Sequence, residues 1–164
     1  MKDYKLDYKR WGQKPPYYVR KLVKYFRKGK KSFFYRILFT LHKRMHQNEI
    51  PWNTEIGPGL YLFHAYGITI NCHAKIGKNC ALSKNVLIGQ ELRGTRKGSP
   101  TLGDSVYVGL GAAIVGKVTI GNDVLIAPNA FVNCDVPSHS VVFGNPCIIK
   151  HKDDATKDYI HFPI

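Results

Sequence analysis

The sequence predicts an all-β solenoid, a parallel β-helix of short strands, preceded by a short basic α-helical arm. Two observations predict it: aliphatic residues return every six positions across residues 50–132, and positive charge is concentrated ahead of that region. Residues 1–50 hold 15 Lys and Arg against 3 Asp and Glu, a net charge of +12, whereas the other 114 residues carry a net charge of +2. We therefore expect a basic arm attached to a nearly neutral body.

The six-residue repeat runs in three phases. Its aliphatic positions are Ile50, Ile56, Leu62 and Ile68, then Ile70, Ile76, Leu82 and Ile88, then Leu102, Val108, Ile114, Ile120, Ile126 and Val132. A period of six fits neither a helix nor a long strand, but it fits short strands joined by tight corners of small residues. Stacked coils of such strands bury the aliphatic residues in a parallel β-helix, and this regularity excludes scattered strands of a sandwich.

The arm lacks the repeat and instead spaces its apolar residues as helices do. Residues 17–26 and 32–46 form two amphipathic stretches; Pro15 and Pro16 precede the first, and Gly29 and Ser32 separate the two. We expect their apolar faces to pack on the β-helix or on each other. An anionic membrane surface is an open alternative, and nucleic acid is disfavoured because no recognised binding motif accompanies the charge.

Cysteine usage predicts a reducing, cytoplasmic compartment. Cys72, Cys80, Cys134 and Cys147 form no C-x-x-C pair and have the neighbours of small core residues, so we expect reduced thiols rather than disulfides or a metal site. The N-terminus has no apolar segment typical of a secretory signal. The longest apolar run, residues 32–41, is interrupted by Arg36 and is too short to cross a bilayer.

His64 lies where the repeat is interrupted. The phase that ends at Ile68 restarts at Ile70, so two extra residues must be accommodated beside this histidine. An irregularity in a rigid coil can redirect a side chain, and such irregularities are frequent at active sites. The other six histidines (His42, His46, His73, His139, His151 and His161) occupy positions typical of structural or merely exposed residues.

Three features together resemble the hexapeptide-repeat acyltransferases, in the branch of the serine acetyltransferases and polysaccharide O-acetyltransferases. They are the repeat, the segment L-F-H-A-Y-G-I-T-I at residues 62–70, and the closing pattern D-V-P…V-F-G-N-P at residues 135–146. The resemblance implies a left-handed β-helix with three hexapeptides per coil, assembled as a homotrimer. It divides the chain into a basic helical arm (residues 1–48), an acyltransferase domain (residues 49–149) and a tail (residues 150–164).

The resemblance also implies a mechanism. His64 matches the general base that takes the proton from an acceptor hydroxyl as it attacks the thioester of acetyl-CoA, and imidazole suits this task because it titrates near neutral pH. Glu49, fifteen residues earlier, occupies the position of the acid that orients the base, where the family usually has Asp. A solvated Glu49 that ends the arm is the open alternative.

The acceptor is predicted from two departures. Serine acetyltransferases carry Asp immediately before the catalytic histidine and a second His before the next proline, whereas this chain has Phe63 and Ser99. Since those family residues hold the charged groups of serine, we expect a saccharide hydroxyl as the acceptor, contacted by Phe63, Tyr66 and Ser99. Sugars stack on aromatic rings such as Phe63.

The resemblance assigns acetyl-CoA to two regions. In the first, residues 90–100 match the loop that covers the site, with Arg93, Arg96 and Lys97 contacting the phosphates of CoA. A solvated basic loop is the alternative. In the second, the coil edges resemble the groove for the pantetheine arm and the adenine end. The predicted cofactor-binding residues are Gly89, Arg93, Arg96, Lys97, Leu110, Gly111, Ala112, Pro128, Pro146 and Lys150.

The sequence thus predicts an acetyl-CoA-dependent O-acetyltransferase that modifies a small-molecule or lipid-linked saccharide, without metal or nucleic acid. Work at a lipid-linked glycan on the inner face of the membrane would give the basic arm a purpose. Two alternatives stay open: a serine O-acetyltransferase of cysteine biosynthesis, and a non-catalytic β-helix scaffold.

Overall fold

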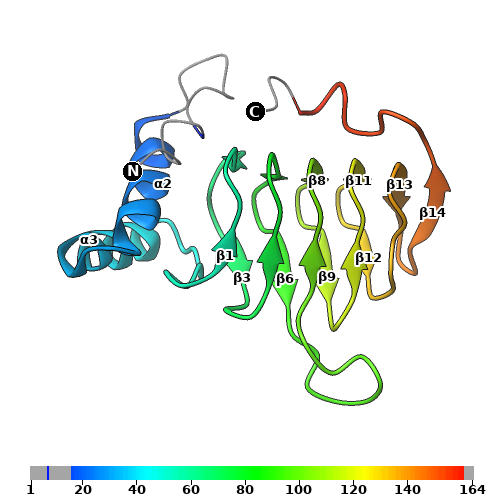
Figure 1. The fold of residues 1–164 in the computed structure, drawn as a ribbon, viewed down its shortest axis with the longest axis horizontal. Helices are drawn as coiled ribbons and strands as arrows, with labels where there is room; N and C mark the ends of the chain where they lie inside the picture. The colour runs from blue at the N-terminus through cyan, green and yellow to red at the C-terminus, as the bar shows by residue number, and fades with distance from the viewer. Residues whose placement is uncertain (1–6, 8–15, 161–164) are drawn as a thin grey trace.

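The computed structural model describes residue 7 and residues 16–160 (Figure 1). Two helices, α2 (Tyr17–Gly29) and α3 (Phe33–Met45), precede the strands of the coil. The strands are β1 (Glu55–Ile56), β2 (Tyr61–Leu62), β3 (Thr69–Ile70), β4 (Lys75–Ile76), β5 (Ala81–Leu82), β6 (Leu87–Gly89), β7 (Thr101–Leu102), β8 (Val106–Val108), β9 (Ala113–Val115), β10 (Thr119–Ile120), β11 (Val124–Ile126), β12 (Phe131–Val132), β13 (Ser140–Phe143) and β14 (Ile148–His151).

The strands form three sheets that the chain visits in turn. The first sheet has the order β1-β4-β7-β10, the second β2-β5-β8-β11-β13-β14, and the third β3-β6-β9-β12. All pairs are parallel except β13 with β14, which form an antiparallel hairpin at the C-terminal end. The expected parallel strands and N-terminal helical region are confirmed, and Figure 1 shows the coils standing side by side along one axis.

The six-residue repeat is the length of one strand plus one corner. The aliphatic positions point inward and stack between coils, as in the column of Ile88 and Ile114, both fully buried. Small residues follow because successive corners touch: a Cβ atom added to Gly77 would lie 2.4 Å from the carbonyl oxygen of Gly103. At position 77, therefore, only glycine permits the close approach of this corner to the corner of the next coil.

Three corners join the sheets, and we name each by its contents. The histidine corner, between the second and third sheets, comprises residues 63–68, 83–86, 109–112 and 127–130, and we include residues 144–146, which stack on its end although they turn within the second sheet from β13 to β14. The loop corner, between the third and first sheets, comprises residues 71–74, 90–100, 116–118 and 133–135. The tail corner, between the first and second sheets, comprises residues 57–60, 77–80, 103–105, 121–123 and 137–139.

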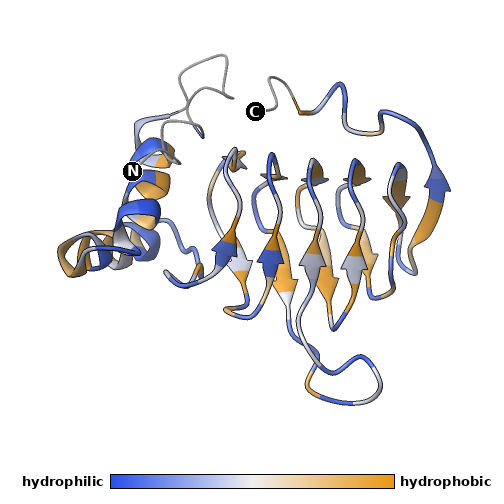
Figure 2. Cartoon of the chain, in the orientation of Figure 1, coloured by the Kyte–Doolittle hydropathy of each residue, from blue (hydrophilic) through white to orange (hydrophobic). Residues whose placement is uncertain are grey.

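The arm helices pack against each other and against the first coil, as the amphipathic pattern predicts. The inner face of α2 is fully buried through Val19, Leu22, Val23 and Phe26, and Phe26 meets Phe39 of α3 with ring centroids 5.5 Å apart. The outer face of α3 is apolar but exposed, and consists of Phe33, Phe34, Ile37, Leu41 and Met45 (Figure 2). In the described part of the chain, no helix combines the length and the apolar character that crossing a membrane requires.

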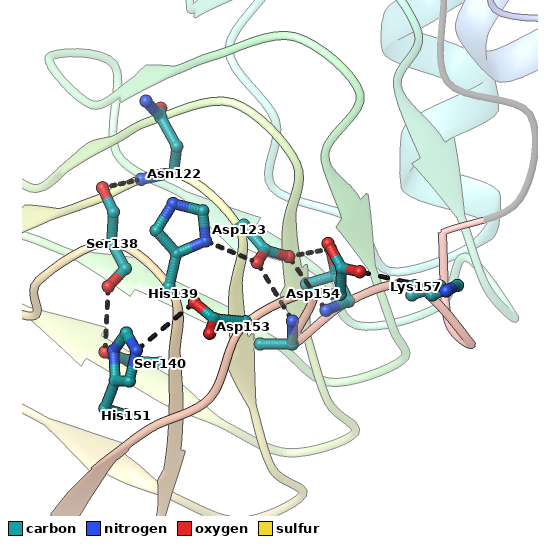
Figure 3. Close-up of polar contacts among 11 residues, drawn as sticks. Asn122, Asp123, Ser138, His139, Ser140, His151, Asp153, Asp154 and Lys157 are labelled. Carbon is teal, nitrogen blue, oxygen red and sulfur yellow. Dashed lines mark hydrogen bonds and ion pairs between the residues drawn. The ribbon is translucent and has the colours of Figure 1, made fainter.

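The tail returns over the coil and is fastened at Asp123 (Figure 3). The Asp123 carboxylate accepts hydrogen bonds from the backbone N–H groups of Ala155 and Thr156, from the Thr156 hydroxyl, and from the His139 ring, at 2.7–3.0 Å. Farther along the tail, the Tyr159 ring packs on Tyr107 of β8 at 4.8 Å. The tail is thus part of the folded body, and its first strand, β14, spans the predicted domain boundary at residue 149.

Neutralising Asp123 is expected to release the tail. Partial burial disfavours the charged carboxylate, but the hydrogen bonds from Thr156, His139 and Ala155 outweigh it and lower the pKa of Asp123 below its usual 3.8. Since the folded pKa is depressed, this contribution is present above about pH 4 and is lost as pH falls through the folded pKa. Acidification, or Asp123→Asn at neutral pH, should shift the NMR amide signals of Ala155 and Thr156 toward unstructured values. Asp153→Asn, at an exposed tail carboxylate, is the matched control; retained Ala155 and Thr156 signals in Asp123→Asn would contradict the role of Asp123.

Candidate functional site

The interruption of the repeat at His64 is a two-residue insertion in the histidine corner. Leu62 pairs with Leu82, and Thr69 pairs with Leu87, so six residues (63–68) make the turn that four residues (83–86) make in the next coil. The two coils nevertheless stay in register on both sides. The extra length therefore forms an outward bulge, residues 63–68, rather than a shift of the strands.

His64 is exposed on this bulge and has an unusual backbone conformation. Its φ of 47° lies in the left-handed region, which residues other than glycine seldom adopt. The N–H of Tyr66 donates to the carbonyl of His64 at 2.6 Å, closing a tight turn. Within the described part of the chain, the imidazole takes part in no hydrogen bond or ion pair, so its nitrogens are available to a ligand.

Two contacts with the next coil hold the bulge. The N–H of Asn85 donates to the carbonyl of Tyr66 at 3.0 Å. Gly67 has a φ of 65°, and a Cβ atom there would lie 2.4 Å from the Asn85 side-chain oxygen. The bulge thus fits closely against the coil and cannot swing freely.

Glu49 lies near the bulge, but its side chain makes no hydrogen bond to His64 among the described residues. Its backbone pairs with Thr69 in an isolated parallel β-bridge, and its carbonyl accepts the N–H of Ile70 at 2.9 Å. Glu49 therefore lies beside β3, at the first-coil end of the third sheet. Its carboxylate favours the charged form of Lys43, although burial is the larger effect and lowers the pKa of Lys43. The orienting contact between Glu49 and His64 stays a prediction.

The histidine corner brings most of the predicted pantetheine and adenine contacts into line with His64. Leu110, Gly111 and Ala112 occupy this corner two coils beyond the bulge, and Pro128 lies one coil further. Pro146 follows at the end of the corner, because the N–H of Phe131 donates to the carbonyl of Gly144. With coils about 4.8 Å apart, the line from His64 to Pro146 spans about 19 Å. Its small residues and the half-exposed Leu110 leave an edge that an elongated molecule can follow.

The remaining predicted cofactor residues, except Lys150, lie across the third sheet. Arg93, Arg96 and Lys97 are exposed on the protruding hairpin of the loop corner, which Glu91 and Gly98 close and which Figure 1 shows as the longest loop of the coil. Gly89 ends β6 at the base of this hairpin. Lys150 is apart from them, on β14, with its ammonium 5.7 Å from the Phe143 ring centroid. The three cations therefore flank the outer face of the third sheet opposite His64.

The three residues predicted to bind the acceptor make contacts within the protein. Phe63 stands edge-on between Tyr61 and Tyr107, with ring centroids 4.3 and 5.9 Å away. Tyr66 packs on the arm rings of Tyr18 and His46. Both rings thus pack against other aromatic rings, although Tyr66 stays 39% exposed.

The third predicted acceptor residue, Ser99, lies in the loop corner. Its hydroxyl donates to the Asn71 side chain at 3.0 Å.

The four cysteines are free thiols, and Cys134 and Cys147 lie with their sulfur atoms 3.6 Å apart. Among the described residues, no group of three or more His, Cys, Asp or Glu side chains is placed to hold a metal ion.

Comparisons with known proteins point to one family. No protein-family model matches the chain. The serine acetyltransferase of Helicobacter pylori (strain ATCC 700392 / 26695) is 33% identical over 126 residues, which cover 76% of this chain and 74% of that protein. The serine acetyltransferase of Synechococcus elongatus is 33% identical over 123 residues, 75% of this chain but only 50% of that protein. A solved structure of serine acetyltransferase isoform 3 from Entamoeba histolytica, in complex with cysteine, has a TM-score of 0.73 at 22% identity, covering 96% of this chain and 63% of that one.

These relatives correct the expected acceptor. The prediction of a saccharide acceptor, small or lipid-linked, is wrong, because the relatives are serine acetyltransferases. That prediction relied on Phe63 as a stacking surface for a sugar, but the Phe63 ring packs edge-on against Tyr61 and Tyr107. The expected role of the basic arm at a lipid-linked glycan on the membrane is therefore wrong as well.

Proposed function

This chain belongs to the serine acetyltransferase family of hexapeptide-repeat acyltransferases, and we propose that it transfers the acetyl group of acetyl-CoA to the hydroxyl of serine. It is an acyltransferase, and acetyl-CoA is its co-substrate. The observation that carries the proposal is the bulge at residues 63–68, which places an exposed histidine, without a bonding partner among the described residues, at one end of an edge lined by small residues.

In the proposed reaction, His64 is the general base. Its imidazole accepts the proton of the serine hydroxyl as the oxygen attacks the thioester carbonyl, forming the new C–O bond. The C–S bond then breaks, and the imidazolium returns the proton to the sulfur of CoA. The step is a direct transfer with no covalent intermediate on the enzyme, and Glu49 orients the ring in this scheme.

The co-substrate fits the chemistry of the two corners. The small residues 109–112 and 127–130 of the histidine corner suit the pantetheine arm, and backbone groups supply its polar contacts. Arg93, Arg96 and Lys97 carry the positive charge that phosphates require. Since these cations lie across the third sheet from His64, we infer that acetyl-CoA lies between adjacent copies in a homotrimer of left-handed coils.

The division of the chain belongs to the same proposal. We assign the arm to residues 1–48, the catalytic coil to residues 49–149 and the tail to residues 150–164. A cytoplasmic location, predicted from the free cysteines, is kept as part of the proposal.

Serine should be the preferred acceptor, although with a high KM. Phe63 and Ser99 replace the two family side chains that hold the charged groups of serine, and both are engaged within the protein. The test measures CoA release from acetyl-CoA by the full chain, with L-serine, other amino acids and a panel of saccharides. We expect the highest kcat/KM with L-serine; a saccharide that exceeds it, or turnover independent of any acceptor, would contradict the proposal.

A further inference from the structure

Two backbone polar groups of the bulge at residues 63–68 form no hydrogen bond with the neighbouring strands of the described coil. They are the carbonyl of Ala65 and the N–H of Ile68. Ala65 and Ile68 are both fully buried, and the bonds to the next coil run through Tyr66 and Thr69 instead. The Asn48 side chain serves both groups. Its amide nitrogen donates to the carbonyl of Ala65 at 2.8 Å, and its amide oxygen accepts the N–H of Ile68 at 2.9 Å.

Asn48 is itself held rigidly between α3 and the coil. It is 3% exposed, and its backbone N–H donates to the carbonyl of Lys43 at the end of α3. Residues on both sides of it in the chain bond to the same bulge: the carbonyl of His46, two residues earlier, accepts the N–H of Gly67, and the N–H of Glu49 donates to the carbonyl of Ile68. The end of the arm therefore lies along the bulge like an additional strand.

We infer that Asn48 is a positioning residue for His64, an inference that rests on the proposed function. The carbonyl that it holds belongs to Ala65, the residue directly after His64, and the left-handed backbone of His64 persists only if its surroundings fix it. Without Asn48, two buried polar groups lose their partners, and the bulge must rearrange to reach water or other partners. A displacement of about 1 Å at a catalytic group can reduce the rate about 10²-fold.

Asparagine is the residue that this position requires. It presents one donor and one acceptor at the same reach, whereas aspartate offers acceptors only and leucine offers neither. Asn48→Leu should therefore lower kcat about 10²-fold, with the KM for acetyl-CoA little changed, since residues 109–112 and 127–130 are not touched. Asn48→Asp keeps an acceptor for the N–H of Ile68 but turns a second oxygen toward the carbonyl of Ala65, so it should also lower kcat, and it serves as the second variant if the leucine variant folds poorly.

Thr54→Val is the matched control. Thr54 is fully buried in the same coil and donates its hydroxyl to the carbonyl of Pro51 at 2.9 Å, and it makes no hydrogen bond to the bulge among the described residues. Its replacement should lower Tm while leaving kcat unchanged. If Asn48→Leu lowers Tm as Thr54→Val does and also keeps the wild-type kcat, Asn48 only stabilises the fold and the inference is overturned.

A second readout separates this inference from the proposed function. The NMR signal of the His64 ring, identified by its loss in His64→Gln, should shift in Asn48→Leu and stay in place in Thr54→Val. Both NMR results are expected even if the wild type transfers no acetyl group to serine. That outcome would reject the proposed function and would leave the positioning role of Asn48 intact. An unshifted His64 signal in Asn48→Leu would reject the positioning role.

Discussion

Replacing His64 by glutamine is expected to lower kcat/KM for acetyl transfer to L-serine by about 10²- to 10⁴-fold, the usual contribution of a general base. The exposed imidazole at the bulge is the one imidazole in the histidine corner of the described chain, and imidazole is the most frequent general base of enzymes. Glutamine keeps the size and a hydrogen-bonding group but cannot take up the proton. Steady-state release of CoA measures the effect.

The control for His64→Gln is its stability. Because the wild-type ring has no protein partner among the described residues, Tm should not change appreciably. His73→Gln, at an exposed histidine of the loop corner, should keep both Tm and activity. A His64→Gln variant within about threefold of the wild-type rate, far short of the effect of a lost base, would remove His64 from the mechanism.

Replacing Arg27 by methionine is expected to destabilise the protein by about 3–5 kcal/mol, as for other broken buried ion pairs. The Arg27 guanidinium bonds to both oxygens of the Asp7 carboxylate at 3.0 and 3.1 Å, and to the carbonyls of Ile56 and Gly57 at 2.6 Å. Its side chain is 6% exposed and that of Asp7 is fully buried. Methionine leaves the buried carboxylate with backbone N–H donors, those of Leu60 and Gly59, and without a positive charge beside it.

Urea unfolding at neutral pH measures this loss. Arg44→Met, at an exposed position of the same arm, should cost less than about 0.5 kcal/mol. Burial is the main cause that raises the pKa of Asp7, and the bonds from Arg27 oppose it. The double variant Arg27→Met with Asp7→Leu should therefore recover much of the stability, because no buried charge is left. A cost below about 1 kcal/mol for Arg27→Met, the range of an exposed pair, would show that the arm is not fastened at this point.

The periodic part of the fold was predictable from the sequence. Inward aliphatic residues recur every six positions because each strand and corner has that length, and the slip beside His64 follows directly from the same count. The arm helices were predictable because their apolar residues recur at helical spacing, and in α2 those residues are the buried ones. These predictions rest on side chains whose spacing alone determines where they point.

Contacts between distant segments could not be predicted in the same way. Asn48 lies outside the repeat and bonds to backbone atoms seventeen and twenty residues away, and Asp123 holds a tail more than thirty residues later. No spacing rule marks such residues. A signal for the packing of Phe63 was present in the repeat, because the register aligns Tyr61 of β2 and Tyr107 of β8 on either side of Ala81 in β5, so aromatic rings stand near residue 63 in the same sheet.

The placement of the reaction at the histidine corner is tested most directly by identifying the product. The full chain is incubated with acetyl-CoA and L-serine, beside His64→Gln under the same conditions, and the mixtures are analysed by mass spectrometry. We expect O-acetyl-L-serine from the wild type in proportion to the CoA released, and at least about a hundredfold less from the variant. Equal product from both proteins, or CoA release without O-acetyl-L-serine, would contradict the account.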